Sequence, residues 1–127
     1  MIDTLIFDLD DTLLINPIDR FLAYLHALSA YLAAYVPADR LIPQLMRSTQ
    51  EMVGNRDPGR TNQAVFAASF YPALGLSEME MSPILAQFYD EEFPKLQVYT
   101  EPVAAVPPLL TDAAARGYGL VVATNPI

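Results

Sequence analysis

The sequence predicts an α/β protein with a doubly wound parallel sheet that is only partly present, and with a helical segment inserted after the first strand. Two short apolar runs, residues 5–7 and 118–123, have the composition of buried strands. Both runs end in polar residues, as parallel neighbours do when they share a site beyond their carboxyl ends. Between them, residues 15–98 show mostly helical periodicity.

The composition is that of a core-forming chain with an acidic balance. Hydrophobic residues make up 53% of the 127 residues and charged residues 17%, which excludes a disordered chain. The net charge is −8 without a basic cluster, so we expect neither nucleic acid nor a membrane surface as a partner. Cysteine is absent, which excludes disulfides and thiolate metal sites. Without a signal peptide or a long apolar segment, we expect a soluble, cytoplasmic protein.

The inserted segment is predicted to begin with two helices. The first covers residues 18–36 and ends before Pro37. The second has Asp39 as its N-cap and ends near residue 53. Residues 54–60 hold two glycines and a proline and are predicted to form a loop.

Two more helices are predicted to complete the insert. Thr61 is the expected N-cap of the third helix, which stops near residues 71–72. Ser77 and Glu80 have the spacing of a capping box at the start of the fourth, and Pro94 is expected to close it.

The chain is then predicted to return to the sheet. A turn-rich segment, residues 97–108, precedes a short helix over residues 109–116. Gly117 has the position of a left-handed residue that ends a helix. The second strand follows directly, and we expect it to pair in parallel with the first.

These elements indicate two domains: a partial α/β core of residues 1–14 and 99–127, and a helical domain of residues 15–98. Both faces and both edges of a parallel sheet need cover. We therefore expect self-association or a further C-terminal part to cover the open sheet edges, and we interpret the chain as the front part of a longer protein.

Three aspartates, Asp8, Asp10 and Asp11, lie within four positions after the first strand. Clustered carboxylates repel one another and are costly to desolvate, so we expect a cation among them. On an extended strand, Asp8 and Asp10 would point to the same side. The alternative is an ordinary Asp-rich surface turn, which the apolar residues on both sides disfavour.

Two motifs resemble signatures of the haloacid dehalogenase superfamily. The first is Phe7-Asp8-Leu9-Asp10-Asp11-Thr12-Leu13 and the second is Val121-Val122-Ala123-Thr124-Asn125. The first resembles Asp-x-Asp-x-Thr after a hydrophobic strand, and the second resembles a hydrophobic strand that ends in Ser or Thr. The resemblance covers residues 1–14 and about 99–127 by motif, and the insert by position only. It implies a Rossmann-like sheet and a helical cap domain that excludes water and selects the substrate.

The resemblance also implies roles for individual residues. Asp8 would attack phosphorus and form an aspartyl-phosphate, and Asp10 would act as general acid and base. The Asp8 carboxylate and the Asp10 backbone carbonyl would hold Mg²⁺. The hydroxyl of Thr124 and the backbone amide of Asn125 would bind the phosphoryl group. Thr12 is expected to brace the turn.

An acidic residue at position 10 favours a phosphatase over a dehalogenase, because an alkoxide leaving group needs a proton and a halide does not. The expected substrate is a small phosphorylated metabolite. The resemblance implies a lysine and an acidic pair beyond residue 127, so we expect the 127-residue chain alone to be weak or inactive. The alternative is a non-catalytic module that binds phosphate or a protein partner. A receiver domain and a P-type ATPase fit the sequence less well.

Two further candidates lie in the insert. Arg56 or Arg60 in the loop could meet an anionic group of the substrate, although an ordinary solvated loop is the favoured interpretation. His26 is interpreted as a residue on the face of the first helix.

Overall fold

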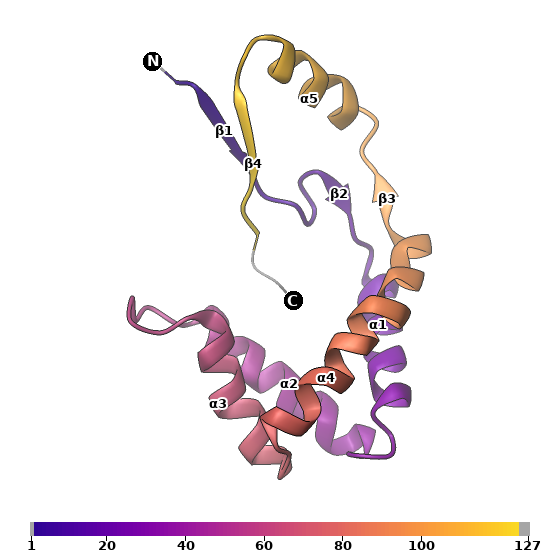
Figure 1. Ribbon diagram of the computed structural model, residues 1–127. Helices are drawn as coiled ribbons and strands as arrows, with labels where there is room; N and C mark the ends of the chain where they lie inside the picture. Colours follow the sequence, from indigo (N-terminus) through magenta and orange to yellow (C-terminus); the bar gives the residue numbers. More distant parts are fainter. Residues whose placement is uncertain (1, 125–127) are drawn as a thin grey trace. The chain divides into compact units, whose positions relative to one another are not determined.

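The computed structural model describes residues 2–124 and shows a mixed α/β chain that divides into two compact units (Figure 1). The sheet unit contains the described residues up to Phe21 and from Leu96 onward. The helical unit runs from Leu22 to Lys95. The chain leaves the sheet unit within helix α1 (Ile18–Tyr31) and returns within the 3₁₀ helix η2 (Phe93–Tyr99).

The sheet unit is built on two parallel strands, β1 (Thr4–Phe7) and β4 (Gly119–Val122), which lie side by side in Figure 1. Their register pairs Leu5 with Leu120. The predicted parallel pairing of these two segments is therefore confirmed. A parallel pair needs a crossover connection, and here the whole helical unit lies within that connection.

Helix α5 (Val106–Ala115) leads into β4 and begins at Val106 rather than at the predicted residue 109. Pro107 and Pro108 fall in its first turn, where a missing N–H costs no helical hydrogen bond. Gly117 has a φ of 85°, the left-handed conformation expected at the end of this helix.

A second, antiparallel pair of strands was not predicted. Strand β2 (Leu14–Ile15) pairs with β3 (Glu101–Pro102), with Leu14 opposite Pro102 and Ile15 opposite Glu101. Each strand has two residues, which is too short for an alternating pattern to be recognised. This pair joins the segment that follows β1 to the segment that precedes α5.

The helical unit begins with α1 and α2 (Ala38–Val53), and both start or end differently from the predictions. Helix α1 stops at Tyr31, and turns and a bend follow it up to residue 36. Asp39 is not the N-cap of α2: Pro37 has that position, and Asp39 lies in the first turn. Proline provides the extended backbone that an N-cap needs, and a carboxylate in the first turn is favourable near the helix N-terminus.

Helix α3 (Asn62–Leu74) and helix α4 (Glu78–Gln87) have the N-caps that the sequence indicates. The Thr61 hydroxyl accepts a hydrogen bond from the Ala64 N–H at 3.1 Å, and the Ser77 hydroxyl accepts one from Glu80 at 3.4 Å. Helix α3 passes its predicted end and stops before Gly75, which has a φ of 70°.

The predicted end of the fourth helix at Pro94 is wrong, because the helical path changes type instead of stopping. Helix α4 continues as a π-helical segment, η1 (Phe88–Glu92), and then as η2. The proline has no N–H and its ring clashes with a carbonyl four residues earlier in a regular α-helix. A wider turn before Pro94 relieves that clash, and the Phe93 N–H accordingly donates to the Phe88 carbonyl.

The core of the helical unit contains an aromatic cluster and a polar network. Phe88 is 0% exposed and its ring meets those of Tyr24, Tyr31 and Tyr89. Between α2 and α3, Gln44, the fully buried Ser48 and Ser69 form a hydrogen-bonded network. These bonds offset the desolvation of the polar groups.

Candidate functional site

The carboxyl ends of β1 and β4 place two of the predicted site residues at the same edge of the sheet. The Ala123 N–H donates to the Phe7 carbonyl at 2.9 Å, which extends the pairing one step beyond β4. Asp8 follows Phe7 and Thr124 follows Ala123, and both side chains are exposed. Asn125 lies outside the described residues.

The segment after β1 is a compact turn organised by one carbonyl oxygen. The Leu9 carbonyl accepts hydrogen bonds from the N–H groups of Thr12, Leu13 and Leu14 at 3.3, 2.9 and 3.2 Å. Asp11 has a φ of 56°, a left-handed conformation that aspartate adopts more readily than most residues. Leu13 is buried and anchors the turn.

The geometry of this turn corrects one expectation. Strand β1 ends at Phe7, before all three aspartates. The alternation of an extended strand therefore does not determine the directions of Asp8 and Asp10. The turn does, and it gives each carboxylate a different hydrogen-bond partner.

Asp8 is held by a local contact. Its Oδ2 accepts a hydrogen bond from the Thr12 hydroxyl at 3.0 Å, so Thr12 braces the turn as expected. Among the described residues, its other carboxylate oxygen has no protein donor, and the side chain is exposed. An exposed carboxylate with a free oxygen can receive a cation or attack an electrophile.

Asp10 is held by a contact that sequence reasoning missed. Its Oδ1 accepts a hydrogen bond from the Asn16 side-chain amide, and the Asn16 backbone N–H donates to Asp11 Oδ1 at 3.1 Å. The Thr100 hydroxyl donates to Asn16 Oδ1 at 3.2 Å. Asn16 lies in neither of the two motifs, and its partner Thr100 is 84 positions away in the chain. No local sequence pattern could have identified this contact.

The oxygens around the turn suit a hard divalent cation. The carboxylate of Asp8 and the backbone carbonyl of Asp10 are oxygen donors of the kind Mg²⁺ prefers, and Mg²⁺ in proteins usually keeps several water or phosphate ligands. Between residues 2 and 124, no three His, Asp or Glu side chains gather into a group that could hold a metal ion.

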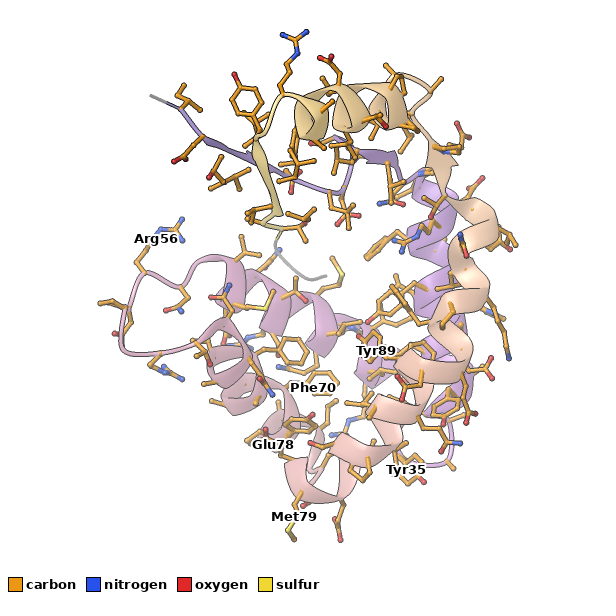
Figure 2. The ribbon with its side chains drawn as sticks, turned by 45° about the horizontal axis from the view of Figure 1, so that its top comes forward. Tyr35, Arg56, Phe70, Glu78, Met79 and Tyr89 are labelled. Carbon is orange, nitrogen blue, oxygen red and sulfur yellow. The ribbon has the colours of Figure 1, made fainter. Side chains whose placement is uncertain are left out.

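In the loop between α2 and α3, the side chain of Arg56 is tied to the backbone of its own neighbours. Arg56 projects from this loop in Figure 2. Its Nη1 donates to the carbonyls of Val53 and Asn55, both at 2.9 Å, and so satisfies oxygens at the end of α2. Asn55 ties the loop together by donating to the Arg60 carbonyl. These contacts give Arg56 a structural role. His26 is exposed on α1, which agrees with its interpretation as a helix-face residue.

A hollow of about 480 Å³ lies in the helical unit, away in sequence from the aspartates. It runs along α3 to the start of α4, where Glu78 is labelled in Figure 2. Its lining includes Thr61, Ala64 and Tyr71 but none of the predicted site residues. Burial raises the pKa of Tyr71, and the nearby Glu78 carboxylate adds to the increase. The turn after β1, where the predicted site residues that the structure describes begin, therefore remains the candidate site.

Comparisons with protein-family models, curated proteins and solved structures found no match to this chain. The family resemblance therefore rests on the two motifs alone. Across residues 2–124, none of the helices has the length and apolar character needed to cross a membrane.

Proposed function

We propose that this chain carries the nucleophile and the acid–base residue of a Mg²⁺-dependent phosphatase of the haloacid dehalogenase type, acting on a small phosphorylated metabolite. The observation that supports the proposal most is the hydrogen bond between Ala123 and Phe7. It places Asp8 and Thr124 immediately beyond paired parallel strands, and ligands of open α/β sheets bind at that edge.

In this mechanism an oxygen of Asp8 attacks phosphorus and the bond to the leaving oxygen breaks. Thr12 occupies the other oxygen of the same carboxylate and so orients the nucleophile. Asp10 gives a proton to the leaving oxygen and later takes one from the water that hydrolyses the aspartyl-phosphate. The Thr124 hydroxyl donates to a phosphoryl oxygen. Bound Mg²⁺ would neutralise part of the negative charge on the phosphoryl oxygens.

Beryllofluoride provides a direct test, because it forms a stable phosphoryl-like adduct on a nucleophilic carboxylate. We expect a Mg²⁺-dependent adduct in the ¹⁹F NMR spectrum of the chain, and we expect Asp8→Asn to abolish it. The matched control is Asp11→Asn, which removes one negative charge from the same turn and keeps an oxygen that can accept from Asn16. No adduct, or an adduct that survives Asp8→Asn, would contradict the proposal.

A second candidate is a non-catalytic phosphate-binding module, which would need neither a nucleophile nor bound Mg²⁺. The two candidates differ in their need for Mg²⁺ and for a carboxylate at position 8. In a binding module, inorganic phosphate would bind without Mg²⁺ and at least as well in Asp8→Asn, since that variant removes a repelling charge. In the phosphatase, phosphate binding would require Mg²⁺.

A further inference from the structure

Asn16 is the centre of a small hydrogen-bonded network in the sheet unit. Its side-chain amide donates to Asp10, its backbone N–H donates to Asp11 at 3.1 Å, and its side-chain oxygen accepts from the Thr100 hydroxyl at 3.2 Å. The side-chain contacts to Asp10 and Thr100 are both partly buried. A single residue therefore fixes two of the three aspartates of the turn.

The chemistry of the three side chains determines how the Asn16 amide is oriented. The side-chain NH₂ group of Asn16 faces Asp10 and donates to its Oδ1. The amide oxygen then faces Thr100, whose hydroxyl can donate. The network thus runs in one direction, from Thr100 through Asn16 to Asp10.

The β2–β3 pair explains why Asn16 and Thr100 meet. Leu14 lies opposite Pro102, and Ile15 lies opposite Glu101. Continuing this antiparallel register by one step puts Asn16 opposite Thr100, and side chains at directly opposed positions are within reach of each other. The short strand pair therefore sets the position of Asn16, although neither strand contains a predicted site residue.

We propose that Asn16 is a positioning residue for Asp10, and that Thr100 fixes Asn16 across the β2–β3 pair. This inference rests on the proposed phosphatase function. A general acid must lie within hydrogen-bond reach of the atom it protonates, and a displacement of about 1 Å can cost about 100-fold in rate. Asp8 is held separately by Thr12, so the nucleophile and the acid–base residue can be perturbed one at a time.

The conformation of Asp10 can be measured directly by NMR, without any turnover. Three-bond couplings to the Asp10 carboxyl carbon report whether its χ1 angle occupies one rotamer or averages among several. We expect one rotamer in the unmodified chain and in Thr100→Ser, which keeps the hydroxyl. We expect averaging in Asn16→Ala and in Thr100→Val, while the Asp8 couplings stay unchanged in both variants. Far-ultraviolet circular dichroism confirms that each variant is folded.

A kinetic measurement then tests the role of this geometry in phosphoryl transfer. Nitrophenolate leaves without needing a proton, whereas an alkoxide needs one. In single-turnover reactions with Mg²⁺, we expect Asn16→Ala and Thr100→Val to slow the cleavage of glycerol phosphate about 10- to 100-fold. Cleavage of p-nitrophenyl phosphate should change less than about 3-fold. Thr100→Ser should restore the rate with glycerol phosphate.

The outcomes separate the two proposals. A single Asp10 rotamer that persists in Asn16→Ala overturns the positioning role, whatever the activity. Equal loss with both substrates also overturns it, because a general structural defect would slow both reactions. An unmodified chain that forms no beryllofluoride adduct on Asp8 overturns the phosphatase function, and with it the catalytic meaning of Asn16, even where the couplings show that Asn16 fixes Asp10.

Discussion

The helical unit and the sheet unit bury their apolar side chains to very different extents. In the helical unit, Phe88 and Leu41 are both 0% exposed. In the sheet unit, Ile6 is 69% exposed and Val122 is 54% exposed, although both lie on the paired parallel strands. Hydrophobic stabilisation is roughly proportional to the apolar area removed from water. The helical unit therefore stabilises itself by burial, whereas β1 and β4 are held by their backbone pairing, and α5 contacts β4.

This difference matters for the candidate site, which lies on the less buried unit. A two-stranded sheet is marginally stable in water. The aspartates are consequently held by local contacts within the turn and by the network around Asn16, rather than by a large core. Changes to core residues of the helical unit and to strand residues of the sheet unit should differ greatly in their effect on stability.

The largest effect is expected for Phe88→Ala. This change removes the ring at the centre of the aromatic cluster and leaves a cavity, which should lower the free energy of unfolding by about 3–5 kcal/mol. Urea unfolding followed by circular dichroism at 222 nm measures the loss. The matched control is Tyr35→Ala, an exposed aromatic residue in the same unit, which should cost far less. Similar losses for the two variants would show that the aromatic cluster is not a packed core.

A smaller effect is expected for Ser69→Ala in the polar network between α2 and α3. The hydroxyl of the fully buried Ser48 would lose its acceptor, at a cost of about 1–2 kcal/mol. The same unfolding experiment applies. Gln50→Ala truncates an exposed polar side chain on α2 and should be close to neutral. A neutral Ser69→Ala would mean that packing alone holds the two helices together.

High pH should destabilise the helical unit through Tyr24. Burial, together with the nearby Tyr89, raises the pKa of Tyr24 well above its usual value. Below about pH 10 the residue is neutral in both states, so this contribution to stability is fully present. Above that pH the unfolded chain loses the proton and the folded chain keeps it, so stability falls by up to about 1.4 kcal/mol per pH unit.

Unfolding in urea between pH 8 and pH 11 measures this dependence. Tyr24→Phe removes the ionisable group and should make the curve flatter, although other groups still titrate. If the slope above pH 10 is the same in Tyr24→Phe, the hydroxyl of Tyr24 is accessible to water in the folded state, and the contrast with the exposed sheet unit is weaker than the structure indicates.

The smallest effect is expected for Ile6→Thr in the sheet unit. The side chain is already exposed and threonine suits a strand, so stability should change by less than about 0.5 kcal/mol. Hydrogen exchange of the β1 and β4 amides provides the measurement. A loss of more than about 1 kcal/mol would indicate that Ile6 is covered in solution. Sedimentation velocity would then show whether a second copy of the chain covers it.

The features that could be predicted from the sequence depend on short stretches of chain. Two apolar runs and their polar ends were sufficient to predict the parallel pairing of β1 with β4. The Thr61 and Ser77 caps follow from side chains that bond to backbone groups three positions away. The prediction that Asp39 is the N-cap of α2 was wrong, because Pro37 already provides the extended residue before this helix. The prediction that the fourth helix ends at Pro94 was wrong, because the backbone widens into a π-helical turn before this proline.

The sequence by itself determined the two apolar runs that form β1 and β4, the cluster of aspartates after the first of them, and the bracing of the following turn by Thr12, since these depend on neighbouring residues. Only the tertiary structure decided how Asp10 is held. Asn16 and Thr100 are 84 positions apart and meet because two strands of two residues each pair in one register. Such a register depends on how the intervening chain folds back, and no local pattern specifies it.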